Sequence, residues 1–543
     1  MAKISGNTLV ARALKAEGVD TIFYLGGGPM FDVMFDSFAE GIRGIDTRHE
    51  QGAAMMAHAY ARVTGKPGIC NTSSGPGTIN AATGMANALA DACPVILLAG
   101  AGPLRDREME AFQEFDQVGT FRPITKWSTQ IYEARRIPEL VSMGFRKATM
   151  NRPGPVLLDF PGDVLYSEVE ESDVIYCQNV QPPARPWGNP DAVKEAVGHL
   201  RGAEKPLILT GTGVLFSGAA EELRELVDLT GIPILTTPQG RGAVPDDHGL
   251  MFASARSTAL READVLLVIG TRFNVILSFG RAPRYNANGK VIMVNIDGEE
   301  IGKNRGVDLG IIGDAKMVLR QLIAEASKGD WRKDTAWVQH LRGIDAKKRT
   351  EMEPFFNSDH TPIHPLRLCK ELRDVLDRDA IVCVDGHDTL NFGRQSIPTY
   401  EPNHRLNAGP SGCMGVAIPY AVAAKAAKPD KQVVALTGDG SFGMNGFEID
   451  TAIRHKLPFV TVISNNGGWT ANHPPKPGRD LNFSRYDKIV ETLGGHGECV
   501  ERPEDIRPAL ERALRADVPS CVNVMVDPAA KSETLRFSVY FQR

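Results

Sequence analysis

The stretch TGDGSFGMNGFEIDTAIRHKLPFVTVISNNGGW, residues 437–469, connects the ends of two apolar segments. The first segment, residues 433–436, runs into the sequence GDG around Asp439; a helical pattern follows, and the second apolar segment ends at Asn466. Parallel strands separated by a helix end at one edge of a sheet, and ligands bind at that edge. We therefore expect Asp439 and Asn466 to lie side by side.

The residue types at this edge suit a cation and a diphosphate. A carboxylate and an amide oxygen are hard ligands for Mg²⁺ or Ca²⁺, and Mg²⁺ held by so few protein groups completes its shell with phosphate and water. Glycine lets a diphosphate approach the backbone closely, and the following helix offers its N-terminus. GDG and NNG also form ordinary turns, so the residues alone leave both interpretations open.

Short apolar strands alternate with helical patterns along the whole chain, as in VDTIFYLGG, CPVILLAGAG and ADVLLVIGTRFN. Continuous apolar runs of this kind are typical of parallel strands buried on both faces. A proline-rich linker, residues 179–190, separates the first block from the second. The pattern predicts an α/β fold with three doubly wound parallel-sheet domains, at residues 1–165, 190–335 and 360–530.

The composition excludes several kinds of partner. The chain has 543 residues, 42% of them hydrophobic, a net charge of −5 and no basic block, so neither nucleic acid nor an anionic membrane is an expected partner. No apolar run is long enough for a membrane span, and the N-terminus has no apolar signal core. The eight cysteines are scattered singly without a CxxC pair, which favours reduced thiols in a cytoplasmic protein.

GDG followed at this spacing by NN resembles the diphosphate-and-metal signature of thiamine-diphosphate-dependent enzymes. Two segments, RHEQGAAMMAHAYARVTGKPG and TSSGPGTINAATGMANALADACPVILLAG, resemble the pyrimidine-binding domain of that family, and RPGPVLLDFPGDV resembles its end. GCMGVAIPYAVAAKAA resembles the start of the diphosphate-binding domain. The resemblance covers nearly the whole chain, and it implies that the three blocks are the pyrimidine-binding, middle and diphosphate-binding domains.

Glu50 heads a run of small and apolar residues that predicts a buried helix, and a buried carboxylate is costly without a partner. The resemblance supplies one: it implies that Glu50 hydrogen-bonds N1′ of the cofactor's aminopyrimidine. A carboxylate there favours the imino tautomer, so the cofactor acts as its own base. Met414 matches the apolar residue that props the cofactor in its bent conformation, although most methionines only fill a core.

The resemblance carries further residues with it. Mg²⁺ would be held by Asp439, Asn466 and the carbonyl of Gly468, while His387 can bind phosphate or satisfy a turn. In the family the two domains around each cofactor come from different subunits, which implies a homodimer or homotetramer with the active site at the subunit interface. The residues expected to bind thiamine diphosphate are Glu50, Ser74, Gly386, His387, Met414, Gly438, Asp439, Gly440, Ser441 and Asn466.

The segment MEAFQEFDQV, residues 109–118, is similar to 2-hydroxyacyl-CoA lyases and close to oxalyl-CoA decarboxylases. This similarity implies that Gln113 faces the reacting carbon, as a catalytic residue, with Phe112 beside it; a glutamine on a helix surface is the alternative. Other segments resemble benzaldehyde lyase, but Pro29 stands where that enzyme carries a histidine. The expected substrate pocket comprises Gly27, Gly28, Pro29, Phe112, Gln113 and Trp469.

The middle block decides the coenzyme A question only weakly. Its segments TGTGVLFSG, IGTRFN and VNIDGEE line a nucleotide-sized cleft in relatives, which can hold CoA, ADP, FAD or nothing. Arg272 would hold a phosphate and Asp297 a ribose hydroxyl, unless the cleft is vestigial. We also expect residues 531–543, with Phe537, Tyr540 and Phe541, to order over the CoA arm as a lid.

The reaction we expect is cleavage of a 2-hydroxyacyl-CoA to an aldehyde or ketone plus formyl-CoA, by a thiamine-diphosphate-dependent carbon–carbon lyase. Acyloin condensation is the chemically equivalent reverse. The alternatives are a benzaldehyde-lyase-like 2-hydroxy ketone lyase, a decarboxylase of oxalyl-CoA or 2-oxo acids, and acetolactate synthase. We rank acetolactate synthase third, because the sequence does not obviously match the FAD-binding pattern of that enzyme.

Overall fold

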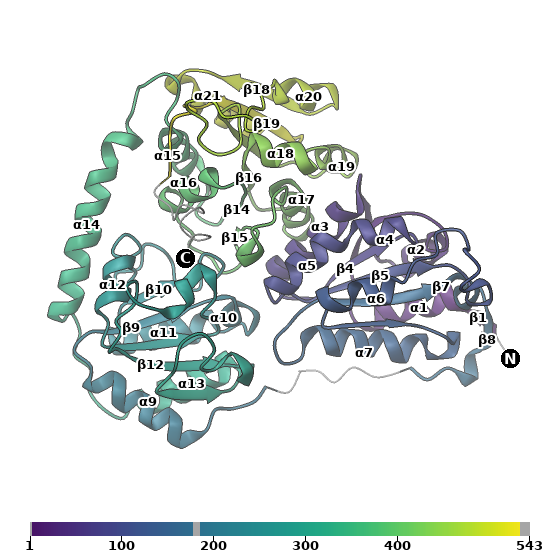
Figure 1. Ribbon diagram of the computed structural model, residues 1–543, viewed down its shortest axis with the longest axis horizontal. Coiled ribbons are helices and arrows are strands. Elements are labelled where there is room, and N and C mark those ends of the chain that lie inside the picture. The colour runs from purple at the N-terminus through teal and green to yellow at the C-terminus, as the bar shows by residue number, and fades with distance from the viewer. Residues whose placement is uncertain (1–2, 177–184, 533–543) are drawn as a thin grey trace. The chain divides into compact units, whose positions relative to one another are not determined.

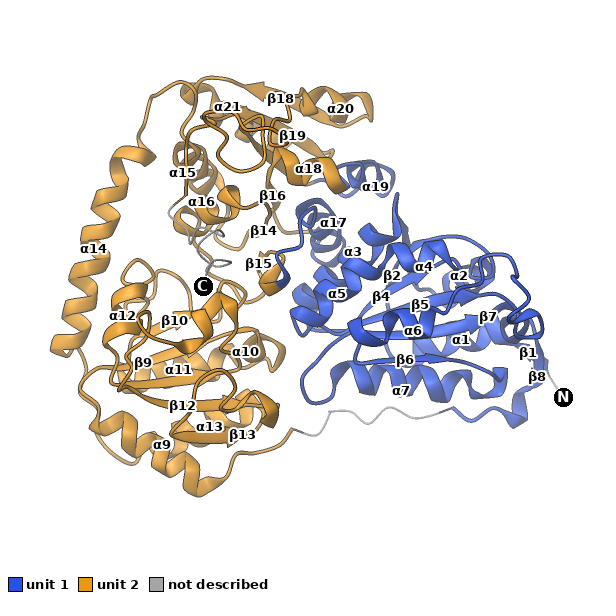
Figure 2. Cartoon of the chain, viewed as in Figure 1, with its two compact units in different colours: residues 1–183, 411–429, 445–458 blue, residues 184–410, 430–444, 459–543 orange. Residues whose placement is uncertain are grey.

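A computed structural model describes residues 3–176 and 185–532. Contacts divide the chain into two compact units, which Figure 2 shows in different colours. Unit 1 comprises residues 1–183, 411–429 and 445–458, and unit 2 comprises residues 184–410, 430–444 and 459–543. Two short segments from late in the sequence thus belong, by their contacts, with the N-terminal part of the chain.

Unit 1 is built on a six-stranded parallel sheet (Figure 1). The strand order is β3 (Arg43–Asp46), β2 (Thr21–Leu25), β4 (Gly68–Thr72), β5 (Val95–Ala101), β7 (Val156–Pro161) and β6 (Trp127–Gln130). A short antiparallel pair joins β1 (Lys3–Ser5) to β8 (Glu168–Glu170). Every residue of β4 and β7 is buried, because parallel strands are covered on both faces. The principal helices of the unit are α1 (Gly6–Ala16), α2 (Phe31–Ala39), α3 (Glu50–Thr64), α4 (Pro76–Asn80), α5 (Ala82–Ala90), α6 (Gln117–Phe121), α7 (Ile137–Thr149), α8 (Gly162–Leu165), α17 (Ala417–Ala427) and α19 (Glu448–Arg454).

Helix α3 is buried around almost its whole circumference. Its N-cap residue His49 accepts a hydrogen bond from the Gln51 backbone N–H at 3.1 Å. The C-cap of the helix is Gly65, which adopts a left-handed φ of 73° without the strain that a side chain would cause. Small residues let α17 pack directly against it, and the Tyr420 hydroxyl lies 2.9 Å from Nδ1 of His58. An apolar helix of this length is therefore stable only as part of a core, as the run of small residues predicts.

Unit 2 contains two further parallel sheets. The five-stranded sheet has the order β10 (Ile234–Thr236), β9 (Pro206–Thr210), β11 (Val265–Ile269), β12 (Lys290–Asn295) and β13 (Leu309–Ile312). One core beside it involves α9 (Pro190–Gly202), α10 (Thr212–Phe216), α11 (Ala220–Thr230) and α13 (Ala315–Ala326). The other core involves α12 (Arg256–Glu262) and the start of α14 (Ala336–Phe356).

The six-stranded sheet of unit 2 has the order β15 (Arg405–Leu406), β14 (Ile381–Val384), β16 (Val433–Gly438), β17 (Val460–Asn465), β19 (Ser520–Met525) and β18 (His496–Val500). Its helices are α15 (Pro365–Val375), α16 (Asp388–Ser396), α18 (Asp439–Asn445), α20 (Tyr486–Thr492) and α21 (Ile506–Arg515). The predicted fold class, α/β with three parallel sheets, is confirmed.

Some expectations concern parts of the chain that the structure does not describe. The expected lid over CoA falls mainly on residues 533–543, including Phe537, Tyr540 and Phe541, which lie outside the described residues. Part of the proline-rich linker, residues 177–184, also lies outside them. Within the described residues, no helix has the length and apolar character that a membrane crossing would need.

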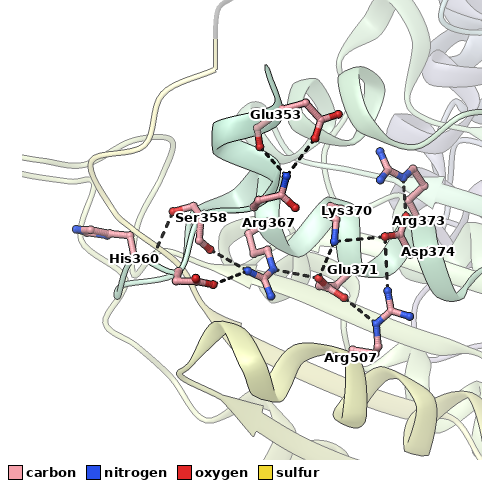
Figure 3. A network of polar contacts seen from close by, with 11 residues as sticks. Glu353, Ser358, His360, Arg367, Lys370, Glu371, Arg373, Asp374 and Arg507 are labelled. Atoms are coloured by element: carbon pink, nitrogen blue, oxygen red, sulfur yellow. Dashed lines mark hydrogen bonds and ion pairs between the residues drawn. The ribbon is translucent and has the colours of Figure 1, made fainter. Parts of the chain in front are cut away.

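A network of charged side chains ties α15 to α21 in unit 2 (Figure 3). The buried Glu371 accepts from Arg367 at 3.0 Å, from Lys370 at 3.2 Å and from Arg507 at 2.9 Å. Burial opposes its charge, but the hydrogen bonds from Arg507 and Lys370 outweigh burial and lower the pKa of Glu371. The ionised carboxylate therefore stabilises the folded state.

We expect Glu371→Ala to lower the free energy of unfolding of this unit by about 1–3 kcal/mol, because its partners lose a buried acceptor. Since the folded pKa is lowered, the contribution is present above the usual glutamate pKa and is lost as the pH falls through the folded pKa. Urea unfolding at pH 7.5 and pH 4 measures both effects. The control Glu351→Ala removes an exposed glutamate of α14 and should change stability by less than about 0.5 kcal/mol. Equal effects of the two substitutions would contradict this account.

Candidate active site

Asp439 and Asn466 follow two paired strands of unit 2. Strands β16 and β17 are parallel neighbours, with Gly438 opposite Ser464. Asp439 is the first residue of α18, and Asn466 comes directly after β17. Both residues therefore emerge at the same edge of the sheet, as their spacing predicts.

The Asp439 carboxylate has an oxygen that no other described residue satisfies. The side chain is 2% exposed, and its Oδ2 atom is buried without a hydrogen-bond partner among the described residues. Burial raises the pKa of Asp439 to about 6, although backbone N–H groups of Gly440 and Gly468 lower it. Buried polar atoms are normally paired, so an orphaned carboxylate oxygen fits a place for a cation.

Asn466 and Gly468 complete the possible metal ligands. The Asn466 Nδ2 atom donates to the Thr470 carbonyl at 2.6 Å, which fixes the amide and leaves its oxygen as the group that can meet a cation. The described residues contain no cluster of three or more His, Cys, Asp or Glu side chains suited to a metal. A cation held here would therefore need further oxygens from its ligand, as Mg²⁺ beside a diphosphate would have.

Glycines bring the backbone and the Trp469 ring close together around Asp439. A Cβ atom at Gly440 would lie 2.6 Å from the Trp469 ring. Gly386 has a φ of 89°, and a Cβ atom there would lie 3.4 Å from the Gly438 nitrogen and 3.6 Å from Oγ of Ser441. The structure thus brings Gly386, Gly438, Gly440, Ser441 and Trp469 together at one sheet edge, and the Trp469 ring leaves space only for glycine at position 440. His387 follows Gly386, and its Nδ1 atom lies 3.6 Å from the carboxylate of Asp388.

In unit 1, Glu50 is the first residue of α3 and is 6% exposed. Asn80, at the end of α4, donates from Nδ2 to Oε2 of Glu50 at 3.0 Å. A Cβ atom at Gly77 would lie 3.0 Å from Oε1. Among the described residues the buried carboxylate therefore has an amide partner and no ion-pair partner, so it can accept a hydrogen bond from a ligand.

Gln113 lies in a turn with Ser74 and the glycine loop before α2. Its φ is 58°, and its Oε1 atom accepts from Oγ of Ser74 at 2.6 Å. Ser74 also donates to the Gly28 carbonyl at 3.3 Å, and a Cβ atom at Gly27 would lie 2.4 Å from Cβ of Ser73. Gln113 is therefore held beside Gly28 by one serine and is not part of a helix.

Three further predicted residues, Pro29, Phe112 and Met414, also belong to unit 1. Pro29 packs beside Gly100, where a Cβ atom would meet its Cδ at 2.8 Å. Phe112 is 85% exposed within the described chain. Met414 belongs to unit 1, directly before Gly415, whose carbonyl accepts from Asn445 at 2.9 Å.

Arg272 and Asp297 come to one edge of the five-stranded sheet, because they follow the neighbouring strands β11 and β12. The Asp297 carboxylate accepts from the Glu299 backbone N–H at 3.1 Å, so it caps a helical turn. Both the nucleotide interpretation and the structural one remain compatible with this arrangement.

Sequence reasoning did not single out Asn80, Gln117 or Asp159, although their polar contacts involve Glu50 or the turn beside Gln113. Asn80 lies within a segment that resembles the pyrimidine-binding domain, but an isolated asparagine carries no spacing signal. Gln117 and Asp159 are 42 positions apart and meet only through packing of β7 against α6.

Comparison with known proteins gives matches along almost the whole chain. Three family models match in order: the thiamine pyrophosphate enzyme N-terminal TPP binding domain at residues 4–120, the central domain at 193–322 and the C-terminal TPP binding domain at 389–524. The chain is 36% identical to a 2-hydroxyacyl-CoA lyase of Arabidopsis thaliana, over 98% of this chain and 97% of the relative.

Two other relatives are nearly as similar. The acetolactate synthase large subunit IlvG of Mycobacterium tuberculosis is 36% identical over 96% of this chain and 95% of its own length. The oxalyl-CoA decarboxylase of Escherichia coli is 32% identical over 97% and 96%. Identity alone therefore does not separate these three activities. The acetolactate synthase is as similar to this chain as the 2-hydroxyacyl-CoA lyase, although the sequence motifs rank that enzyme third.

We expect Asp439→Asn to weaken Mg²⁺-dependent binding of thiamine diphosphate by roughly 100-fold or more, because a cation would lose its one carboxylate ligand here. Isothermal titration calorimetry with and without Mg²⁺ measures the change in Kd. The control Asp430→Asn alters an exposed aspartate and should leave Kd as it is. An unchanged Kd in the Asp439 variant would show that the metal binds elsewhere.

Proposed function

The chain belongs to the thiamine pyrophosphate enzyme family, and on that basis we propose that it is a lyase that cleaves a 2-hydroxyacyl-CoA into an aldehyde or ketone and formyl-CoA. In this reaction the bond between the carbinol carbon and the thioester carbonyl breaks. The hydroxyl oxygen becomes the new carbonyl, and the thioester carbon gains a hydrogen. The atoms of substrate and products balance without an oxidant.

An arginine set in unit 2 is the observation that carries the choice of a CoA substrate. Arg241 and Arg405 converge on one carbonyl, that of Ile397, at 3.1 and 3.4 Å. Arg241 also donates to the Arg394 carbonyl at 3.2 Å. The arginine set comprises Arg241, Arg256, Arg284, Arg394 and Arg405.

The arginine set carries more positive charge than its surroundings balance. Asp246 is the one carboxylate that the described residues place in hydrogen-bond contact with any member, and it pairs with Arg241. Burial, together with Arg284 and Arg394, lowers the pKa of Arg256 to about 10. Burial, Arg241 and Arg394 lower the pKa of Arg405 to about 9. Like charges held this close favour an anionic ligand.

One atom of the arginine set and one atom of a neighbouring tyrosine also lack hydrogen-bond partners among the described residues. Arg405 is 3% exposed, and its Nη2 atom is buried with no hydrogen-bond partner among the described residues; the same holds for the Tyr285 hydroxyl. Arg394, in contrast, is exposed, and its Nη2 atom donates to Oδ1 of Asn391 at 2.6 Å. Guanidinium groups bind phosphate through paired N–H donors, and CoA carries a diphosphate and a 3′-phosphate. These contacts support a CoA thioester over a simple 2-hydroxy ketone.

Thiamine diphosphate, when bound, supplies a nucleophilic carbon suited to attack a thioester carbonyl. Glu50 would accept a hydrogen bond at its carboxylate from the aminopyrimidine ring, and its burial keeps water from competing. Asp439, Asn466 and the Gly468 carbonyl would hold Mg²⁺ beside the diphosphate. Gln113, fixed by Ser74, would orient the substrate hydroxyl or carbonyl.

The assembly and compartment are parts of the same proposal. We propose a homodimer or homotetramer in which Glu50 of one subunit and Asp439 of another hold one cofactor, because the family resemblance assigns them to opposite ends of it. Free thiols at seven described cysteines support a reducing, cytoplasmic compartment. In the middle domain, Arg272 and Asp297 would hold ADP or the adenosine part of CoA.

We expect Arg394→Gln to lower kcat/KM for a 2-hydroxyacyl-CoA by roughly tenfold to 100-fold, because a charged hydrogen bond to phosphate is lost. The same variant should act like wild type on the matching N-acetylcysteamine thioester, which has no phosphate. Arg515→Gln, an exposed arginine of α21, is the matched control. Equal losses on both thioesters would remove the support for CoA.

Product analysis in the same assay separates the candidate reactions. Formyl-CoA with an aldehyde or ketone supports the lyase, whereas release of CO₂ from oxalyl-CoA or from a 2-oxo acid would identify a decarboxylase or an acetolactate synthase. The arginine set is compatible with oxalyl-CoA too, so the products decide between these two CoA substrates.

We expect Glu50→Gln to lower kcat by about 10²- to 10⁴-fold, because a neutral amide cannot favour the imino tautomer as a carboxylate does. Steady-state kinetics at saturating cofactor give kcat, and circular dichroism checks that the variant is folded. Glu17→Gln in the same unit should retain the wild-type kcat. Full activity of the Glu50 variant would exclude the role given to this carboxylate.

A further inference from the structure

The side-chain amide of Gln117 makes three contacts in the interior of unit 1. Gln117 is the first residue of α6 and is 2% exposed. Its Nε2 atom donates to the Asp159 carboxylate and, at 2.9 Å, to the Gly100 carbonyl. Its Oε1 atom accepts from the Gly75 backbone N–H at 2.7 Å. Both the NH₂ group and the oxygen of this amide are thus hydrogen-bonded inside unit 1, which fixes the orientation of the amide.

Asp159 is a buried carboxylate bound by amides. It lies on β7, is 2% exposed, and its second oxygen accepts from Nε2 of Gln130 at 2.7 Å. Burial raises the pKa of Asp159 to about 6, while the Gln130 and Gln117 hydrogen bonds lower it. An ionised carboxylate only accepts hydrogen bonds, so it turns the Gln117 NH₂ group toward itself and the amide oxygen toward Gly75.

The charged groups that act on Asp159 are few. Asp116, directly before α6, raises its pKa, and Arg107, which reaches Gln130 at 3.4 Å, lowers it. Strand β5 presents the Gly100 carbonyl on this side. The Asp159 carboxylate, the Gly100 carbonyl and the Gly75 N–H therefore all favour the same orientation of the Gln117 amide.

Gly75 connects this amide to the residues of the proposed active site. Its φ is 59°, and a Cβ atom there would lie 2.6 Å from the Gln113 carbonyl, so only glycine fits the turn. The Gly75 carbonyl accepts from the Ile79 N–H at 3.0 Å at the start of α4. The same helix ends at Asn80, the partner of Glu50.

We propose that Gln117, anchored by Asp159, is a positioning residue that sets the Gly75 turn and thereby places Gln113 and Asn80. It acts through Gly75 and does not touch the substrate. The inference rests on the proposed function for the roles of Gln113 and Glu50, but the hydrogen-bonded arrangement itself does not depend on the identity of the substrate.

Gln117→Glu tests the proposal because it replaces the donating NH₂ group with a carboxylate oxygen and keeps an oxygen that can accept from the Gly75 N–H. At pH 7.5 the two carboxylates repel, so we expect kcat/KM to fall by roughly tenfold to 100-fold while the protein stays folded. As the pH is lowered toward 5.5, one proton shared by the pair restores the hydrogen bond. The activity of the variant, relative to wild type at each pH, should therefore rise.

Gln117→Glu combined with Asp159→Asn exchanges donor and acceptor. The amide introduced at position 159 can donate from its NH₂ group to the carboxylate introduced at position 117, while its oxygen still accepts from Gln130. We expect partial recovery of kcat/KM at pH 7.5, partial because the Gly100 carbonyl keeps no donor. Recovery on the second substitution would show that the two side chains act as a coupled pair.

Hydrogen exchange of the peptide around Gly75, measured by mass spectrometry at pH 7.5, reads out the turn without any substrate. We expect faster exchange in Gln117→Glu and restored protection in the double variant. Gln130→Glu is the matched control, because it forms the same carboxylate pair on the other oxygen without touching Gly75, and it should keep the protection.

The outcomes separate this proposal from the proposed function. Wild-type exchange in Gln117→Glu, or a kcat/KM loss that neither acid pH nor Asp159→Asn reverses, would overturn the positioning role. Altered exchange in a protein that cleaves no 2-hydroxyacyl-CoA would leave the positioning role in place and refute the lyase assignment.

Discussion

The buried Asp439 carboxylate sets the main constraint on the edge of unit 2 where β16 and β17 end. The interior disfavours its charge, which is why its pKa is raised, and one of its oxygens finds no donor among the described residues. Such an atom lowers stability unless a ligand meets it. The backbone packs closely at the same edge, where a Cβ atom at Gly440 would lie 2.6 Å from the Trp469 ring. On the proposed function, a cation beside a diphosphate would supply the missing partner of this oxygen, so ligand binding would stabilise the unit.

Glu50 and most members of the arginine set are, like Asp439, buried or partly buried charged groups with few partners of opposite charge among the described residues. Glu50 is satisfied on one side by an amide, which leaves it able to accept from a ligand. The arginine set of unit 2 has the opposite sign, and burial together with neighbouring arginines lowers the pKa of Arg256 and of Arg405. Among the described residues, a single carboxylate, that of Asp246, pairs with the set. Each site thus lacks the one kind of group that the proposed cofactor or substrate supplies.

Much of the fold could be predicted because its signals are local. Apolar runs followed by glycine turns indicate parallel strands, and the spacing between Asp439 and Asn466 predicts that both reach one sheet edge. The conformation of Gln113 could not be predicted in this way. Gln113 adopts a left-handed turn conformation, and similarity of its segment to known sequences does not indicate the backbone conformation of a single residue. The arginine set was invisible for another reason, since its members are far apart in sequence and meet only after two sheets have formed within unit 2. The association of α17 with unit 1 likewise depends on packing of small residues against α3. That of α19 depends on polar contacts that Glu448 and Arg454 make with residues 46–49.

On the proposed function, Asp439 and the arginine set hold the two phosphate-bearing molecules of one reaction. The most direct test is a crystal structure of the full chain grown with thiamine diphosphate, Mg²⁺ and CoA. The account predicts Mg²⁺ on Oδ2 of Asp439 and a CoA phosphate against Arg394 and Arg256. A metal bound away from Asp439, or CoA phosphates bound far from the arginine set, would contradict it.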